Sequence, residues 1–256
     1  MSTLFKFTFA TALSCLPLLA WAQAYEGTTC KLPGNTRLKA MLTAGTVDRL
    51  ETYEGNYGLW ATSFLAPSGK APVKPASDDG EAQEEYQRVL VAWSCQYGPG
   101  KAADGDTATA WVEGANGPGV GEVLVVQVNT RKPVRIWSGY GKSPALHGAN
   151  GRPQKVRVHV LQALRIPDVT QVSSVYTDLK LLASAEATLA DKNAYQPLPV
   201  PPHTLQQAKT GSGDPWPQND PLYEQMTFVA LEILSVYPGA KYADTAISEV
   251  SNGEAN

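Results

Sequence analysis

The stretch QKVRVHVL, residues 154–161, carries the clearest structural pattern in the chain. Val156, Val158 and Val160 occupy alternate positions, and a lysine, an arginine and a histidine stand between them. Successive side chains of a β-strand point to opposite faces, so this alternation predicts a strand with one apolar and one polar face. A strand of this kind belongs to a sheet that packs its apolar face against a core.

Similar runs occur on both sides of this stretch. They are short, rich in β-branched or aromatic residues, and bounded by Gly, Pro, Asn or Asp. FVALEILSV, residues 228–236, is apolar on nearly both faces, which is typical of a central strand covered on both sides. TDLKLLASAEATLAD, residues 177–191, fits a strand or a short helix equally well. The remaining predicted strands are QRVLVAWSC (87–95), EVLVVQVN (122–129), PVRIWSGY (133–140) and MTFVALEILSVY (226–237).

These runs predict the fold class and the organisation of the chain. With 19 prolines and no long helical repeat, the sequence favours an all-β protein, an antiparallel β-sandwich. We expect the sandwich to span residues 87–252, with a short tail at 253–256. Residues 25–86 then form an N-terminal segment that is packed on or linked to the sandwich. Its end, APSGKAPVKPASDDGEAQEEY (66–86), mixes Pro, Gly, Ser and charge without periodicity and predicts an exposed loop.

Residues 1–24 have the pattern of a secretory signal peptide. One lysine precedes a short apolar run, which ends in small residues that match an A-x-A cleavage site. Cleavage after Ala22 and cleavage after Ala24 are equally plausible, and an uncleaved anchor is the alternative. No stop-transfer segment follows, so we expect no membrane span after signal removal and a bacterial protein exported to the periplasm or secreted.

Signal removal also changes the number of cysteines. Cys15 leaves with the signal peptide, and Cys30 and Cys95 remain. An even pair in an exported protein predicts a disulfide, which would tie the N-terminal segment to the predicted strand at 87–95. Two reduced, buried thiols are the alternative. A metal site with two cysteines lacks a nearby histidine to complete it.

Charge and motifs exclude several classes of function. The net charge is −3 and the basic residues are scattered, so we expect no nucleic-acid partner and no binding to anionic lipid. SGYGKS (138–143) ends like a phosphate loop, but Ile136 stands where that motif needs glycine, and PALHGANGRP (144–153) has loop composition. No nucleophile motif accompanies the three histidines, which we expect at the surface. They are His147, His159 and His203.

The stretch DGDTATAWVEG, residues 104–114, combines acidic residues, threonines and glycines before an apolar run. Two aspartates on a turn offer hard oxygen ligands that suit calcium, although the spacing is not that of a helix-loop-helix calcium site. Taken alone, Asp-Gly-Asp is more often a plain turn. Trp111, between this turn and the next strand, is better interpreted as a core residue than as a sugar platform.

Five motifs in fixed order carry a resemblance to a bacterial family. They are D-G-D-x-x-T-A-W-V-E-G, G-x-G-E, S-G-Y-x-K-S, N-x-R-P-x-K-V and V-Y-P-G-x-K-Y-x-D-T-A-I-S-E, between Tyr86 and Val250. This region resembles the glycan-binding, translocation-type domain at the N-terminus of streptococcal NAD-glycohydrolase toxins. That domain is related to the discoidin (coagulation factor five/eight type C), galactose-binding-like folds. The resemblance implies an antiparallel jelly-roll β-sandwich of about eight strands.

The resemblance also implies a structural calcium ion. In calcium-bearing discoidin-like lectins, the Asp-Gly-Asp loop and a glutamate near the C-terminus close on one ion. The corresponding side chains here belong to Asp104, Asp106, Thr109 and Glu249, and the carbonyls of Lys101 and Ser248 would complete the shell. Such an ion would join two distant parts of the chain. Turn capping by Asp104 and Glu249 without metal is the alternative.

The function implied is binding of a glycan or glycoconjugate without catalysis. No NAD-glycohydrolase domain follows the C-terminal motif, so we expect the toxins' enzymatic activity to be absent and predict no catalytic residues. An envelope protein-interaction or assembly module that kept the jelly roll without sugar binding is the alternative function. Sugar sites combine aromatic faces with planar polar groups. The candidate ligand residues are Glu113, Tyr140, Lys142, His147, Asn150 and Arg152.

Overall fold

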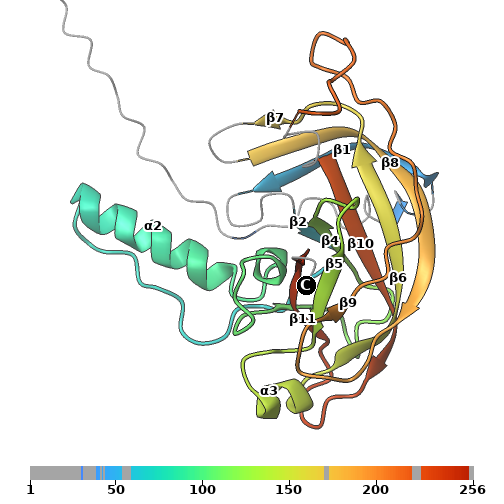
Figure 1. Cartoon of the computed structure of the whole chain (residues 1–256). Coiled ribbons are helices and arrows are strands. Elements are labelled where there is room, and N and C mark those ends of the chain that lie inside the picture. The colour runs from blue at the N-terminus through green and yellow to red at the C-terminus, as the bar shows by residue number, and fades with distance from the viewer. Residues whose placement is uncertain are drawn as a thin grey trace, which may run out of the picture.

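The computed structural model describes residues 30, 39–40, 42, 44–53, 59–169, 173–220 and 226–253 (Figure 1). The predicted signal peptide, with both candidate cleavage sites, lies outside the described residues. Within the described part of the chain, no helix combines the length and apolarity needed to cross a membrane.

Two antiparallel sheets form a β-sandwich, which confirms the predicted jelly-roll fold class (Figure 1). The larger sheet has the strand order β1-β8-β6-β10-β4-β2, with β7 paired to β8. The smaller sheet has the order β3-β11-β5-β9. The strands of the larger sheet are β1 (Thr46–Tyr53), β2 (Leu59–Ala61), β4 (Val123–Gln127), β6 (Arg152–Ala163), β7 (Asp168–Val169), β8 (Ser173–Thr188) and β10 (Thr227–Tyr237). Those of the smaller sheet are β3 (Trp111–Val112), β5 (Val134–Ser138), β9 (Gln196–Pro197) and β11 (Ala246–Asn252).

The main core lies between the two sheets. Val156 and Val158 of β6 pack in one buried cluster with Ile136 of β5 and Val250 of β11. The predicted alternation of residues 154–161 therefore places its valines as expected. Trp111 is fully buried in the same cluster, as its position before a strand predicted.

A second cluster covers the other side of the larger sheet, so β10 is apolar on both faces. Leu231 of β10 faces the main core, whereas Phe228 packs with Trp60 and Tyr176, whose ring centroids lie 5.4 and 5.1 Å away. The prediction of a central, doubly covered strand at 228–236 is confirmed. Strands β1 and β2 extend this sheet, so residues of the predicted N-terminal segment belong to it. The ambiguous stretch 177–191 is mostly strand, in β8.

The prediction of a strand at 87–95 is wrong, because these residues belong to the helix α2 (Gly80–Ser94) and its C-cap. Helix α2 contains three glutamates, two glutamines and two alanines, which favour helix strongly enough to outweigh its two valines. Arg88 Nη2 lies 2.6 Å from Glu85 Oε1, one turn away on the exposed surface. The predicted exposed loop is accurate only to Asp79. Helix α2 projects from the sandwich rather than joining a sheet (Figure 1).

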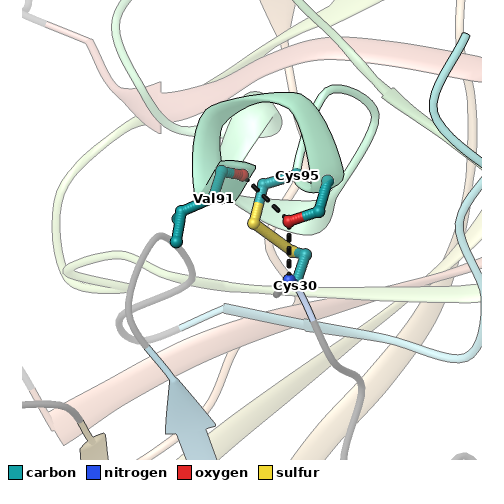
Figure 2. Close-up of a disulfide and its surroundings, with 4 residues drawn as sticks. Cys30, Val91 and Cys95 are labelled. Carbon is teal, nitrogen blue, oxygen red and sulfur yellow. Dashed lines mark hydrogen bonds between the residues drawn. A yellow bond between two sulfur atoms is a disulfide. The ribbon is translucent and has the colours of Figure 1, made fainter. Parts of the chain in front are cut away.

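A disulfide joins Cys30 to Cys95, the pairing that the sequence predicts (Figure 2). The two Cα atoms are 5.0 Å apart across a sequence separation of 65. The Cys30 N–H donates to Ser94 Oγ at 2.8 Å, and the Cys95 N–H donates to the Val91 carbonyl at 2.9 Å. The bridge therefore ties residue 30 to the end of α2, not to a strand.

A short helix, α3 (Pro144–Ala149), occupies part of the stretch 144–153, which was expected to be a loop. Ser143 accepts a hydrogen bond from the Leu146 N–H at 3.2 Å, and Pro144 stands in the first turn. Serine at the cap and proline at the first helical position both favour a helix start. Ser143, the last residue of SGYGKS, is therefore a helix cap.

Candidate functional site

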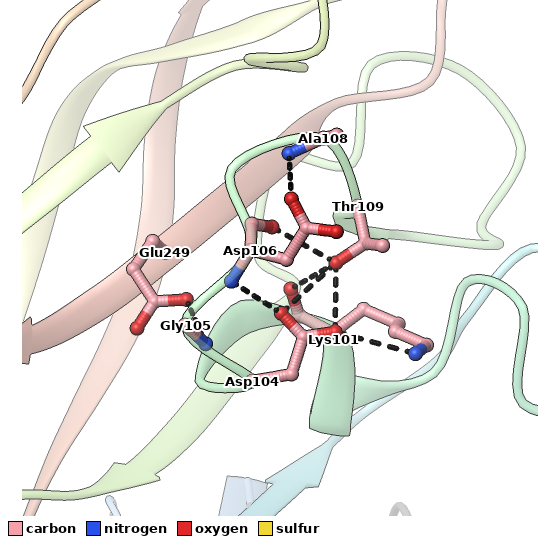
Figure 3. A network of polar contacts seen from close by, with 7 residues as sticks. All are labelled: Lys101, Asp104, Gly105, Asp106, Ala108, Thr109 and Glu249. Atoms are coloured by element: carbon pink, nitrogen blue, oxygen red, sulfur yellow. Dashed lines mark hydrogen bonds and ion pairs between the residues drawn. The ribbon is translucent and has the colours of Figure 1, made fainter.

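The Asp-Gly-Asp loop is a compact turn that follows the short 3₁₀ helix η1 (Pro99–Ala102) (Figure 3). Gly105 has φ of +78°, a conformation that glycine adopts without strain. The Asp106 N–H donates to Asp104 Oδ1 at 3.0 Å, and the Ala108 N–H donates to Asp106 Oδ1 at 2.8 Å. Both aspartates thus hold the backbone of the loop in shape.

Other oxygen and cationic groups converge on Asp104 (Figure 3). Thr109 Oγ1 lies 2.8 Å from Asp104 Oδ2 and 3.0 Å from the Asp106 carbonyl oxygen. Lys101 Nζ forms an ion pair with Asp104 Oδ2 at 3.2 Å. Asp104 is therefore bound by a hydroxyl and by an ammonium group at once.

Glu249 of β11 reaches the same loop from 144 residues away. Its side chain is directed at the turn, and its Oε2 accepts the Gly105 N–H at 3.1 Å (Figure 3). Only 3% of the residue is exposed. Burial, reinforced by the negative charges of Asp104 and Asp106, raises the pKa of Glu249 to about 7, although the Gly105 N–H opposes the shift.

These groups fit a hard cation. The atoms available as metal ligands are carboxylate, hydroxyl and carbonyl oxygens, which calcium prefers. The ammonium of Lys101 already shows that Asp104 attracts positive charge. Within the described residues, no three Asp, Glu, His or Cys side chains group as a metal site by themselves. The Thr109 hydroxyl and the carbonyls of Lys101 and Ser248 would therefore have to complete the shell.

Arg152, a predicted ligand residue, is only 7% exposed and has internal partners. Its Nη2 lies 2.6 Å from Asp191 Oδ2, and its Nη1 donates to the carbonyls of Asn150 and Pro238 at 2.9 and 3.1 Å. The hydrogen bond from Arg152 lowers the pKa of Asp191. The guanidinium thus joins three loop segments of the sandwich.

Glu113 is fully buried and also bonded internally. Its Oε1 accepts the Thr245 N–H at 3.0 Å and its Oε2 accepts the Ala115 N–H at 2.7 Å. Burial raises its pKa, and these two backbone bonds oppose the shift. Glu113 fixes the glycine-rich loop to the start of β11.

Two further predicted ligand residues are buried in or beside α3. His147 Nε2 lies 3.2 Å from the Ser138 carbonyl oxygen, and burial lowers the pKa of the imidazole. The Asn150 side-chain amide donates to the Leu146 carbonyl at 2.8 Å. Among the six predicted ligand residues, only Tyr140, which is partly exposed, and Lys142, which is exposed, reach the surface.

The expectation that the histidines lie at the surface is wrong for His147 and His159, which are buried. His159 Nδ1 lies 2.7 Å from Ser184 Oγ. Its Nε2 is 3.5 Å from Glu232 Oε2, whereas Arg157 Nη1 donates to that oxygen at 2.9 Å. Of these two contacts with Glu232, the one made by Arg157 is the shorter.

His203 lies apart, beside a cleft of about 490 Å³ that Thr130, Pro201 and Gln218 help to line. Its Nε2 is 2.9 Å from Thr130 Oγ1, and its Nδ1 is 2.9 Å from the Pro201 carbonyl oxygen. A proton on Nδ1 satisfies both contacts, so the ring bridges two loops.

One group of polar and aromatic residues was missed in the sequence. Arg135 and Trp137 of β5 alternate with the buried Val134 and Ile136, so they lie on the outer face of the smaller sheet. Tyr195 stands beside them, its ring centroid 5.0 Å from that of Trp137 and 4.0 Å from Arg135 Cζ. The alternation in PVRIWSGY was the available signal.

Comparisons with known proteins bear on the whole domain. A family model described as NAD glycohydrolase translocation F5/8 type C domain matches residues 81–253. A search of curated proteins finds no match. The structure of arabinofuranosyltransferase AftD from Mycobacteria is similar over 79% of this chain, with 13% identity and a TM-score of 0.36. This chain spans only 11% of that protein. CBM32 of AlyQ, in complex with 4,5-unsaturated mannuronic acid, is similar over 61% of this chain and 86% of its own, with 14% identity and a TM-score of 0.28.

Proposed function

The chain belongs to the NAD glycohydrolase translocation F5/8 type C domain family, and on that premise we propose that it is an exported, non-catalytic carbohydrate-binding module. The observation that carries the proposal is the family match over residues 81–253. That range includes nine of the eleven described strands in full, in both sheets, together with the Asp-Gly-Asp loop. The ligand would be a glycan or glycoconjugate.

The loop between β5 and α3 supplies the first candidate contacts. Tyr140 is partly exposed there and Lys142 is exposed, and Tyr140 also packs against Val112 and Ala246. A fixed aromatic residue next to a flexible cation suits a polar, hydroxyl-rich ligand. Arg152 and His147 support this loop from beneath, so they would position the contacts rather than make them.

The same observations give the alternative function a specific basis. Four of the six predicted ligand residues are buried and hydrogen-bonded within the domain, namely Glu113, His147, Asn150 and Arg152. Fewer polar groups are therefore available to a sugar than the sequence predicted. A module that binds an envelope protein through its surface would need none of them. Screening the mature protein on a glycan array tests the two functions. Reproducible binding to a glycan class supports the first, and no binding to any glycan favours the second.

We also propose that the Asp-Gly-Asp loop and Glu249 hold one structural calcium ion. The support is the contact of Glu249 with the Gly105 N–H, between the two aspartates, together with the burial of the Glu249 carboxylate within the field of Asp104 and Asp106. A divalent cation would favour the ionised form of that carboxylate. The ion would join the loop after η1 to strand β11.

A further inference from the structure

The outer face of the smaller sheet holds an aromatic and cationic patch, formed by Arg135, Trp137 and Tyr195. Arg135 stands opposite Ser251 in the register of β5 and β11, and Trp137 stands opposite Glu249. Because Ile136 is buried in the core, the side chains of Arg135 and Trp137 lie on the other side of the sheet. All three members of the patch are partly exposed.

Internal contacts hold the patch in one geometry. The Trp137 indole N–H donates to Asn193 Oδ1 at 2.9 Å, and Arg135 Nε donates to Ser251 Oγ at 3.2 Å. Arg135 lies over the Tyr195 ring, with Cζ 4.0 Å from the centroid. Side chains fixed in advance lose little conformational entropy when a ligand binds.

Gly141 of SGYGKS supports the indole from the side. A Cβ added at Gly141 would lie 2.6 Å from Trp137 Nε1 and 2.6 Å from the Thr107 carbonyl oxygen. This glycine is therefore needed for close packing of the loop between the indole and the Asp-Gly-Asp turn. The patch and the predicted ligand loop are neighbours, since Tyr140 and Lys142 flank Gly141.

The patch leaves hydrogen-bonding capacity unused. Among the described residues, no hydrogen bond or salt bridge is seen at Nη1 or Nη2 of Arg135, although its positive charge lowers the pKa of the nearby Glu249. A guanidinium fork binds a carboxylate through two parallel hydrogen bonds, and a partly exposed aromatic side chain offers a surface for the apolar face of a sugar ring. Together these groups suit a sugar that carries a carboxylate.

We propose that Arg135, Trp137 and Tyr195 form a subsite for an acidic glycan, with a uronic acid carboxylate on Arg135 and a ring against the aromatic pair. The inference rests on the proposed carbohydrate-binding function and names the class of sugar. It places the acidic group on the sheet face, beside the loop that carries Tyr140 and Lys142.

The experiment is calorimetric titration with two probes, an oligogalacturonate and a neutral galactose oligomer of equal length. The wild type should bind the acidic oligomer more tightly. Arg135→Ala should weaken acidic binding by about tenfold and neutral binding much less, because the charged pair serves only the acidic oligomer, whereas the lost contact with the Tyr195 ring affects both. Arg135→Lys should recover part of the loss, because it keeps the charge without the fork. Tyr195→Ala should weaken binding of both oligomers.

The chain offers a matched control in Lys241 and Tyr242, another exposed cation–aromatic pair, with Nζ 4.9 Å from the ring centroid. Lys241→Ala and Tyr242→Ala should bind both oligomers like the wild type. Thermal melting checks the fold of every variant, and Trp137→Phe replaces any aromatic variant that does not fold.

Two results would overturn the subsite. One is a wild type that binds neutral glycans at least as tightly as acidic ones, and the other is acidic binding that Arg135→Ala does not alter. Either would leave the proposed carbohydrate-binding function standing. Absence of binding to every glycan on the array would instead remove both proposals.

Discussion

A single buried carboxylate, that of Glu249, shows how the calcium proposal can be tested at the scale of one residue. Burial, with the charges of Asp104 and Asp106 in addition, raises its pKa to about 7, so ionisation is costly unless a cation is present. A ligand that binds only the folded state stabilises it by about 2.7 kcal/mol at a hundredfold excess over its Kd. We expect calcium to raise the melting temperature and a chelator to lower it, with magnesium much less effective.

Glu249→Gln should abolish most of that calcium response, whereas Glu84→Gln, on the exposed surface of α2, should keep it. The readout is scanning calorimetry of each protein with calcium and with chelator. Identical melting of the wild type under both conditions would show that the loop is a turn without metal.

The ion pair of Arg152 with Asp191 predicts how stability depends on pH. The pKa of Asp191 is lowered in the folded state, so the unfolded chain takes up the proton first as the pH falls. The stabilisation is therefore present above the ordinary aspartate pKa, near 3.8, and is lost as the pH falls through the lower, folded value. Urea unfolding at several values of pH measures this acid limb, the fall in the free energy of unfolding as the pH is lowered.

Asp191→Asn should lower the free energy of unfolding at neutral pH and flatten the acid limb. We expect a cost of about 1–2 kcal/mol, less than for a fully enclosed pair, because 37% of the Asp191 side chain is exposed. Arg165 and Asp178 form an exposed pair at 2.6 Å, and Asp178→Asn is the control. Equal costs for the two variants would contradict a structural role for Arg152.

At the scale of elements, the sequence correctly predicted those strands that bury one apolar face or both faces. The alternation at 154–161 and the apolar run at 228–236 each correspond to a strand in the larger sheet, because burial follows the strand period there. The stretch 87–95 failed for a physical reason. Its helix projects from the sandwich with no sheet beneath it, so local propensity decided its structure and the pattern of valines carried no information about burial.

The loop between β5 and α3 provides a test of close packing. Gly141→Ala should destabilise the domain by about 1–3 kcal/mol, because the added Cβ collides with the Thr107 carbonyl and the Trp137 indole. The near-ultraviolet circular dichroism of the indole should change as well. Gly211→Ala is the control, since no atom lies within 4 Å of its added Cβ. A stable Gly141→Ala protein with an unchanged spectrum would contradict the packing described here.

Helix α2 is tethered by the disulfide, and this predicts a labelling result. Alkylation of the unreduced, denatured, exported protein should modify neither Cys30 nor Cys95. After reduction both should react, and the free energy of unfolding should fall by about 4 kcal/mol in the chain-entropy description of a loop of this length. Mass spectrometry counts the labels. Two labels on protein that was never reduced would exclude the bridge.

At the scale of the whole molecule, the fold could be predicted and much of the site could not. The order of the motifs predicted the jelly roll. The sequence also related the Asp-Gly-Asp loop to Glu249, whose carboxylate accepts the Gly105 N–H. The burial of Glu113 and Arg152 depends on backbone groups at Thr245 and Pro238, far away in the chain. Local patterns do not contain such partners. The patch at Arg135 and Trp137 was visible as an alternation, but its aromatic neighbour comes from another loop.

Family membership leads to a negative prediction for the whole protein. The matched domain is described as a translocation domain, and the described histidines and carboxylates form no catalytic constellation. Purified protein incubated with NAD should therefore release no nicotinamide above a heat-inactivated control. Turnover that persists through repurification would show that the protein is an enzyme.

The order of strands in the smaller sheet also constrains when the domain can fold. Strand β11 lies between β3 and β5, and β3 pairs with no other strand of that sheet. A chain that emerges from an export channel with its N-terminus first cannot complete this sheet until residues 246–252 have emerged. Until then, β3 and one side of β5 are open edges, which are prone to wrong pairing. Because the smaller sheet forms late, the polypeptide would stay unfolded while it passes through the channel. The two sheets would then pack together only after release.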